Sequence, residues 1–280
     1  MTLARSVLFL PASNARAIAK ARGLNCDIAV LDIEDAVAPE AKAEARRAAL
    51  AALLEGGFGP RVGVRVNGLD TPWGRDDLAA LGDAAALIIL PKIETAEAVQ
   101  EAARLAPKAA LWAMIETPRA VLALDAIAGS DAPLEALMLG VNDLAEGLGC
   151  GASADREPLK PWLAATVAAA RAHGLLAVDG VFNRFEDEAG LQAECAQGRL
   201  YGFDGKSLIH PRQIAAANAA FAPAADEVAR ARAIVAAFAA PEAAGMGAIR
   251  LDGGMIERLH LEAAERLIDR HEACQAVDSA

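Results

Sequence analysis

Two acidic residues, Glu116 and Asp143, stand at positions where they could share one cation. Glu116 directly follows the apolar run Ala110–Ile115, and Asp143 comes shortly after the apolar run Leu134–Leu139. The intervening segment Pro118–Ile127 favours a helix, since proline is well tolerated in a first turn. A helical crossover makes two flanking strands parallel. Both carboxylates are therefore expected at the carboxyl edge of one sheet, on neighbouring strands only about 4.8 Å apart.

This pair predicts a site for a hard divalent cation. Magnesium prefers about six oxygen ligands and usually keeps several waters, whereas histidine or cysteine ligands would indicate another metal. The alternative is that Glu116 is only a helix N-terminal acid and Asp143 a cap.

Arg65, in the segment Arg65-Val-Asn-Gly68, adds a second chemical group. A guanidinium holds a carboxylate with two parallel hydrogen bonds, or opposes negative charge that develops on an enolate, as lysine cannot do bidentately. The alternative for Arg65 is a structural ion pair with Asp35 or Glu94.

Eight apolar runs, mostly separated by alanine-rich stretches of helical character, would position these groups. Near-continuous apolar strands between helices indicate a parallel sheet covered on both faces. Eight such units in 280 residues predict a (β/α)8 TIM barrel, with an open doubly wound sheet as the alternative. The runs are Val7–Leu10, Ile28–Ile33, Val62–Val66, Leu87–Leu90, Leu111–Ile115, Ala136–Leu139, Leu175–Val178 and a segment around Tyr201–Ile209.

The repeat stops near residue 222, which predicts a barrel over residues 1–222 and a C-terminal helical extension over 223–280. Ala224–Ala239 and Leu261–Glu272 are expected to be helices, with a turn at Gly253-Gly254. An extension this short cannot bury a core of its own. It is expected to act as a lid that packs on the barrel or on a neighbouring subunit.

The overall composition excludes several classes of function. A net charge of −11 opposes binding to nucleic acid or to an anionic membrane surface. The four cysteines occur singly, which opposes a zinc site or a disulfide framework and favours a reducing compartment. No run approaches the roughly 20 apolar residues that span a bilayer. The sequence therefore predicts a cytoplasmic protein.

Short motifs run in order along nearly the whole chain. Individually several are weak, but together they resemble the HpcH/HpaI aldolase/citrate lyase family, in particular its branch of citrate lyase β-subunits and malyl-CoA or citramalyl-CoA lyases. The motifs are Arg5–Pro11, Leu31–Val37, Arg65–Gly68, Pro91-Lys92, Met114–Thr117, Gly140–Leu144, Gly202–Pro211 and Leu251–Glu257.

The resemblance implies a Mg²⁺-binding barrel, usually in trimers or hexamers whose C-terminal segment covers a neighbour's active site. Matched position by position, Glu116 and Asp143 correspond to the metal ligands, and Arg65 to the substrate-binding arginine. Glu34 and Asp35 correspond to the catalytic acidic pair beside the metal.

The resemblance also places coenzyme A near Phe9 and Lys20. The family usually has an arginine where this chain has Asn14, so Arg16 is the nearest candidate for the CoA phosphates. The acid/base group supplied across the subunit interface corresponds to Glu257, where the lyase branch commonly has aspartate. Its extra methylene displaces the carboxylate, and misplacement by about 1 Å can cost on the order of 10²-fold in rate.

Four further cations have weaker claims. Lys92 is expected to pair with Glu34 or Glu94 beneath the metal, and Lys206 to meet a CoA phosphate or a carboxylate. Lys42 and Arg46 lie one helical turn apart and are interpreted as surface charges.

The function expected from these residues is a Mg²⁺-dependent carbon–carbon lyase. Its substrate would be a short carboxylated 3-hydroxyacyl-CoA of the malyl-, citramalyl- or citryl-CoA type, cleaved into an acyl-CoA such as acetyl-CoA and a 2-oxo acid. Three alternatives stay open: a malyl-CoA thioesterase of the same family, a weakly catalytic subunit that binds an acyl-carrier partner, and an aldolase that uses free 2-oxo acids.

Overall fold

The computed structural model describes residues 2–240, 243 and 245–279. Two compact units make up the chain. One is Ala4–Phe221, and the other is built mainly from the residues that follow it.

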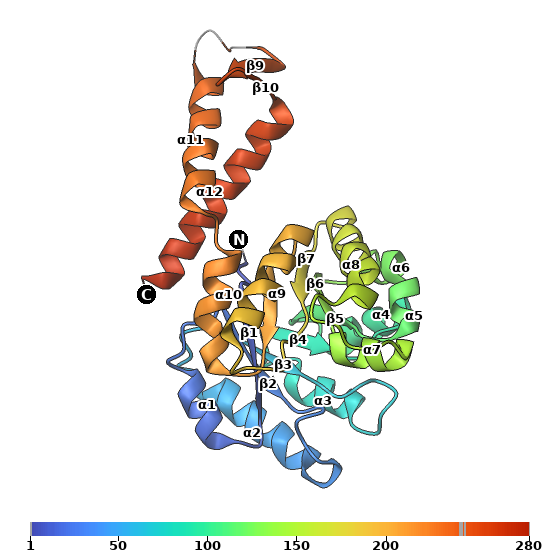
Figure 1. The fold of residues 1–280 in the computed structure, drawn as a ribbon. Helices are drawn as coiled ribbons and strands as arrows, with labels where there is room; N and C mark the ends of the chain where they lie inside the picture. Colours follow the sequence, from blue (N-terminus) through green and yellow to red (C-terminus); the bar gives the residue numbers. More distant parts are fainter. Residues whose placement is uncertain (1, 241–242, 244, 280) are drawn as a thin grey trace. The chain divides into compact units, whose positions relative to one another are not determined.

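The larger unit is a closed barrel in which eight described strands each pair in parallel with the next, and β8 pairs with β1 (Figure 1). This confirms the predicted (β/α)8 fold. The strands are β1 (Ser6–Pro11), β2 (Ile28–Asp32), β3 (Arg61–Arg65), β4 (Leu87–Leu90), β5 (Ala110–Ile115), β6 (Leu134–Leu139), β7 (Leu176–Asp179) and β8 (Gly205–Leu208).

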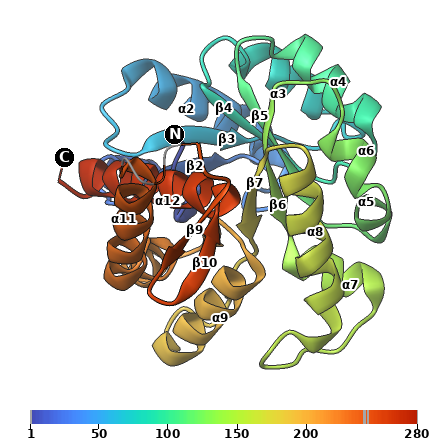
Figure 2. The same cartoon turned by 90° about the horizontal axis from the view of Figure 1, so that it is seen from above.

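Helices surround the strands on the outside of the barrel (Figure 2). Two details differ from the sequence prediction. The predicted helix Pro118–Ile127 is two short helices, because Ala123 has a non-helical backbone. The eighth strand is shorter than predicted, because α9 continues to Tyr201. The barrel helices are α1 (Ala15–Ala21), α2 (Lys42–Glu55), α3 (Gly74–Leu81), α4 (Ala96–Leu105), α5 (Pro118–Leu122), α6 (Leu124–Ala128), α7 (Val141–Leu148), α8 (Lys160–Ala172), α9 (Glu188–Tyr201) and α10 (Ile214–Phe221).

Successive strand residues point alternately into the barrel and toward the helices. One set fills the interior: Val7, Ile28, Val30, Leu87, Ile89, Trp112, Met114, Ala136, Met138 and Val178. The alternate set, which includes Leu8, Leu31, Val64 and Leu137, packs in the core that the helices share. This alternation decides which side chains reach the mouth of the barrel.

The smaller unit contains α11 (Ala225–Ala239), α12 (Arg258–Asp278) and a hairpin of β9 (Ala248–Leu251) and β10 (Gly254–Glu257). The two helices lie near their predicted positions, but the sequence analysis predicted only the turn of the hairpin. Contrary to the expectation that an extension this short cannot bury a core of its own, Ala231, Ile234, Ile256 and Ala264 form a small core of this unit. Packing of the extension on the barrel or on a neighbour stays a prediction.

All four cysteines are free thiols, as the sequence indicated. In the part of the chain that the structure describes, no helix combines the length and apolar character that crossing a membrane requires.

A buried ion pair ties the starts of β1 and β2 together. The Nη2 of Arg5 lies 2.8 Å from Oδ1 of Asp27, and the Arg5 main-chain N–H donates to Oδ2 at 2.7 Å. Each side chain is only 1% exposed. Two desolvated charges depend on one another, since removal of one partner leaves the other in a medium of low polarity.

We therefore expect Asp27→Ala to lower the free energy of unfolding by about 3–5 kcal/mol, measured by urea denaturation. Asp83→Ala, which breaks the exposed pair between Asp83 and Lys108, is the matched control and should change it little. Equal small effects of both substitutions would contradict this account.

Candidate active site at the carboxyl edge of the barrel

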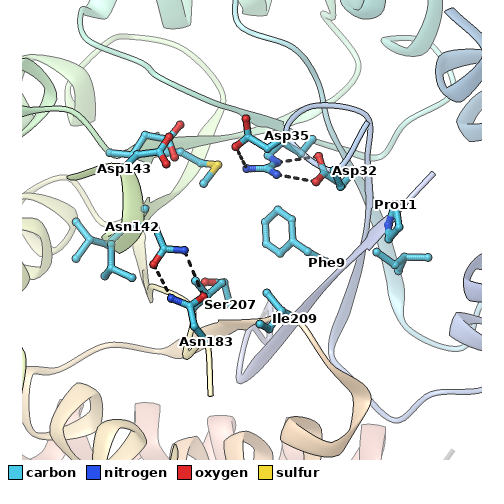
Figure 3. A pocket seen from close by; sticks show the side chains of 18 residues that line it. Phe9, Pro11, Asp32, Asp35, Asn142, Asp143, Asn183, Ser207 and Ile209 are labelled. Atoms are coloured by element: carbon cyan, nitrogen blue, oxygen red, sulfur yellow. Dashed lines mark hydrogen bonds and ion pairs between the residues drawn. The ribbon is translucent and has the colours of Figure 1, made fainter. Parts of the chain in front are cut away.

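A cavity of about 410 Å³ opens at the carboxyl ends of the strands (Figure 3). Barrel enzymes place their chemistry at this face. The lining comes from segments far apart in sequence: Phe9, Leu10, Pro11, Asp32, Asp35, Ala36, Arg65, Met114, Glu116, Leu139, Gly140, Val141, Asn142, Asp143, Val181, Asn183, Ser207 and Ile209.

Strand alternation explains how four of these side chains reach the cavity. Phe9 and Asp32 continue the interior-facing sets of β1 and β2, and Glu116 continues that of β5, after Met114. Arg65 is one position beyond Val64, which packs toward the helices, so its side chain faces the interior.

The Arg65 guanidinium is held in one orientation by Asp32. Its Nε donates to Oδ1 of Asp32 at 2.9 Å and its Nη2 to Oδ2 at 2.6 Å. Nη1 lies 2.9 Å from Glu34 and 3.4 Å from Asp35, and the group lies over the Phe9 ring, 5.2 Å from its centroid. Burial opposes the charged form, but the bond to Asp32 and the surrounding carboxylates raise the pKa of Arg65 further. Arg65 is therefore a fixed positive charge at the cavity wall.

Lys92 connects the acidic groups on the same side. Its Nζ lies 2.7 Å from Glu34, 3.5 Å from Asp143 and 3.7 Å from Asp35. Its backbone has a φ of +50°, uncommon for a residue with a side chain, and its main-chain N–H donates to Oε1 of Glu116 at 2.7 Å. Such local strain often occurs at functional sites.

Glu116 is a buried carboxylate with an unusual proton affinity. Burial, and then the negative charge of Glu34, raise the pKa of Glu116 to about 7. Gly140 makes room for it, because a side chain there would collide with the Glu116 carboxylate. Thr117 caps α5 through the Ala120 N–H, so helix capping does not explain Glu116. Asp143, in the first turn of α7, is partly exposed and lines the cavity.

These groups fit a divalent cation that takes part of its ligands from elsewhere. Five carboxylates at the mouth face two cations, Arg65 and Lys92; the carboxylates are Asp32, Glu34, Asp35, Glu116 and Asp143. Within residues 2–240, 243 and 245–279, no cluster of three or more histidine, cysteine, aspartate or glutamate side chains forms a ready-made ligand set. Mg²⁺ is usually bound by one or two protein carboxylates, and oxygens of substrate and water complete its coordination.

The interpretation of Lys42 and Arg46 as surface charges was wrong. Lys42 is only 6% exposed, and its Nζ donates to the main-chain oxygens of Ile33 at 3.1 Å and Glu34 at 2.6 Å. Burial lowers the pKa of Lys42. Arg46 holds Asp77, which in turn accepts from Asn67 beside the same loop. Both cations therefore support the loop that carries Glu34 and Asp35.

The structure contradicts a contact of Lys206 with coenzyme A phosphate. Lys206 is fully buried, and its Nζ lies 2.6 Å from Glu194 and 3.2 Å from Asp179. Its neighbour Ser207 lines the cavity, so strand alternation turns Lys206 toward the helices. The other predicted pairing, with a carboxylate, is the one observed.

The remaining candidates are not among the residues that line the cavity. Arg16 and Lys20 are exposed on α1, whose first turn is capped by Asn14. Glu257 ends β10 in the smaller unit. Glu94 pairs with Arg119 rather than serving as the anchor of Arg65.

Sequence reasoning missed three groups. In the sequence, Asp32 is only one of several acids near the end of the second predicted strand. The structure distinguishes it, because strand register places Asp32 opposite Arg65. Asn142 and Asn183 carried no signal, because amides follow many strands.

Comparisons with known proteins agree with this geometry. The family model for HpcH/HpaI aldolase/citrate lyase matches residues 5–211. A (3S)-malyl-CoA thioesterase of Cereibacter sphaeroides is 45% identical over 274 residues, covering 97% of this chain and 96% of the relative. An L-malyl-CoA/beta-methylmalyl-CoA lyase of the same species is 33% identical over 304 residues, with the same coverage.

Among solved structures, the CitE protein from Mycobacterium tuberculosis in complex with magnesium, acetoacetate and coenzyme A is 33% identical. It superimposes with a TM-score of 0.79 over 95% of this chain and 97% of that one. The chain belongs to the HpcH/HpaI aldolase/citrate lyase family, as the motifs indicated. This is a family of enzymes.

The raised pKa of Glu116 predicts a pH-dependent penalty on folding. Because the unfolded group titrates near 4.5 and the folded group near 7, the folded protein loses stability as the pH rises through this interval. Glu116→Gln keeps a side-chain carbonyl oxygen as a hydrogen-bond acceptor but cannot ionise. In the presence of a chelator, the free energy of unfolding of this variant, relative to that of the wild type, should increase from pH 5 to pH 8 by up to about 3 kcal/mol.

Urea denaturation at each pH provides the measurement. Glu146→Gln, at an exposed position of α7, is the control for the substitution itself. If the free energy of unfolding changes with pH in the same way for Glu116→Gln and the wild type, Glu116 ionises normally and the prediction is wrong.

Proposed function

We propose that this protein is a Mg²⁺-dependent enzyme that acts on the thioester of a short carboxylated 3-hydroxyacyl-CoA such as malyl-CoA. The observation that carries the proposal is the cavity in which Glu116 and Asp143 lie with the fixed guanidinium of Arg65. The names of the thioesterase and lyase relatives support the substrate class. The magnesium and coenzyme A in the CitE complex support the cofactor and the form of the substrate.

Glu116 and Asp143 would hold the cation. When bound, Mg²⁺ supplies a Lewis acid that orients the carboxylate and hydroxyl of the substrate. The burial that raises the pKa of Glu116 is offset by a divalent charge, which favours the ionised form. Lys92, within 3.5 Å of Asp143, limits repulsion among the carboxylates before the cation binds.

Arg65 would polarise the thioester. Negative charge develops on the thioester oxygen both when an enolate forms and when water adds to the carbonyl carbon. A fixed donor serves either transition state without reorganisation. Asp32 holds Arg65 through two hydrogen bonds, so its role is to position the guanidinium rather than to touch the substrate.

The two reactions differ after this point. In hydrolysis, water adds to the carbonyl carbon, the carbon–sulfur bond breaks, and free CoA leaves with a hydroxy dicarboxylic acid. In lyase cleavage, the hydroxyl loses its proton, the carbon–carbon bond breaks to give a 2-oxo acid, and the enolate of the acyl-CoA takes up a proton.

Hydrolysis is the better supported net reaction. The thioesterase is 45% identical over nearly the whole of both chains, against 33% for the lyase. Glu257, where the lyase branch commonly has aspartate, points the same way, because a displaced carboxylate returns a proton to the enolate less well. Carbon–carbon cleavage, the reaction predicted from the sequence, is the second candidate and has the lyase relatives as its support.

The rest of the substrate would extend past Phe9 toward the exposed α1. Arg16 and Lys20 give this helix positive charge suited to CoA phosphates. Four free thiols support a reducing, cytoplasmic location.

The products decide between the reactions. With Mg²⁺ and malyl-, citramalyl- or citryl-CoA, we expect turnover that a chelator abolishes, and release of free CoA without a 2-oxo acid. Arg65→Lys should lower kcat by about 10²-fold, because a single ammonium cannot replace a positioned bidentate donor. Arg75→Lys, at an exposed pair with Glu101, is the matched control.

Accumulation of acetyl-CoA and a 2-oxo acid would establish the lyase instead. No turnover of any free CoA ester, with tight co-purification of an acyl-carrier protein, would identify a weakly catalytic subunit and overturn the proposal.

The assembly we propose is a homotrimer or hexamer in which Glu257 of one copy serves the cavity of another, where its carboxylate would take a proton from the water that adds to the thioester carbon. In that case Glu116→Gln and Glu257→Gln proteins are each nearly inactive but regain activity when subunits are exchanged, since mixed interfaces contain one intact site. Light scattering gives the oligomeric state, and the activity of the mixture is the test. A mixture that stays as inactive as its parts would place Glu257 outside the site.

A further inference from the structure

A second cavity of about 220 Å³ lies next to the first. Four residues line both cavities and so form the wall between them: Val141, Asn142, Val181 and Asn183. Two come from the start of α7, which follows β6, and two from the segment after β7. This wall, called here the amide wall, carries no charged side chain.

The centre of the amide wall is a reciprocal pair of side-chain amides. Nδ2 of Asn183 donates to Oδ1 of Asn142 at 2.8 Å, and Nδ2 of Asn142 donates to Oδ1 of Asn183 at 3.3 Å (Figure 3). In Figure 3 the pair faces Phe9 from the side opposite Asp32. Each amide thus donates one hydrogen bond to the other and accepts one, and the two exposed side chains link the segments after β6 and β7.

Much of the lining of the second cavity suits methylene and methyl groups. Small or apolar residues supply much of its lining, among them Ala145, Ala152, Ala154, Pro158, Leu159 and Phe182. Its buried charges, Arg156 and Glu194, belong to a network in which Arg156 binds Asp179 at 2.7 Å and Glu194 binds Lys206 at 2.6 Å. Arg184, which also lines the cavity, pairs with Asp187 at 3.2 Å, and Nη2 of Arg156 is a buried donor without a hydrogen-bond partner among the described residues.

The far wall of this cavity is anchored. Arg156 has a φ of +57°, and its side chain is bound to Asp179 at the end of β7 and to Gln197 on α9. A residue with a side chain holds this backbone conformation only where its surroundings impose it. The space behind the amide wall is therefore bounded by fixed groups on the side of Arg156, while the exposed loop 151–154 borders it on the side of the solvent.

We propose that the Asn142–Asn183 pair determines specificity for acyl size. Closed, it limits the acyl group to what the first cavity holds, so that short 3-hydroxyacyl-CoA esters fit and longer alkyl branches collide with it. Opened, it joins the first cavity to an apolar space behind. This inference rests on the proposed function and deepens it by naming the residues that restrict the substrate.

A plain structural role for the pair makes a different prediction. If the two amides only clamp the segments after β6 and β7, their loss displaces Asp143 and weakens every substrate alike. If they form a size barrier, their loss changes the ratio between long and short substrates. The ratio, rather than the absolute rate, is the informative quantity.

The experiment compares wild type, Asn183→Ala and the control Gln192→Ala, which removes an exposed amide of α9. Each is given malyl-CoA and a homologue with a butyl branch on the acyl chain. Thioether analogues of both esters, which cannot react, provide dissociation constants by calorimetry. We expect Asn183→Ala to raise the branched-to-short ratio of kcat/KM, and of affinity, at least about tenfold, the discrimination that one methylene typically makes in an apolar pocket.

A second substitution tests the path of the branch. Ala154→Leu, added to Asn183→Ala, fills the second cavity from its loop side and should reverse most of the gain. Thermal unfolding verifies that each variant is folded.

An unchanged ratio in Asn183→Ala, with uniformly lower activity, would overturn the size barrier and leave the proposed function standing. A gain that Ala154→Leu does not reverse would overturn the second cavity as its cause. Failure of the wild type to bind either analogue would overturn the proposed function and this inference together.

Discussion

The double hydrogen bond between Asp32 and Arg65 is the interaction on which the site depends. It joins the ends of the neighbouring strands β2 and β3 at the barrel mouth and fixes the guanidinium before any substrate arrives. A preorganised charge in a buried site requires no reorganisation at the moment of reaction, which is the usual source of a large catalytic effect. The neighbouring acids then adapt to Arg65, since Glu34 and Asp35 both lie within ion-pair distance of it.

The support for this arrangement lies outside the barrel wall. Lys42 binds the main-chain oxygens of Ile33 and Glu34 from the helix side, and Asn67 donates to the same oxygen of Ile33. These buried donors hold the loop after β2 through its backbone, so the side chains of Glu34 and Asp35 stay available to the cavity. The charged groups of the site are thus held in place by a second group of buried polar side chains.

The two sides of the cavity differ in electrostatics. Carboxylates and two cations make one side, while a neutral pair of amides makes the other, where Val141 and Val181 add apolar surface. A polar thioester with a carboxylated acyl group has a charged end and an uncharged chain, and this division matches it. Under the proposed function the same charged groups would serve either hydrolysis or carbon–carbon cleavage, in keeping with a family that contains thioesterase and lyase relatives.

The sequence by itself determined the barrel and the direction in which its chemistry points. Apolar runs separated by helical segments are a local property, and parallel crossovers bring Glu116 and Asp143 to one edge whatever the side-chain details. What only the tertiary structure decided was the burial and the partner of each charge. The sequence suggested a surface charge for Lys42, and a CoA phosphate or a carboxylate as the partner of Lys206, yet both lysines are buried. Strand register makes Asp32 the hydrogen-bond partner of Arg65, and the convergence of two segments brings Asn142 to Asn183. Neither contact could be predicted from the sequence, because hydrogen bonds between side chains far apart in the chain produce no periodic pattern.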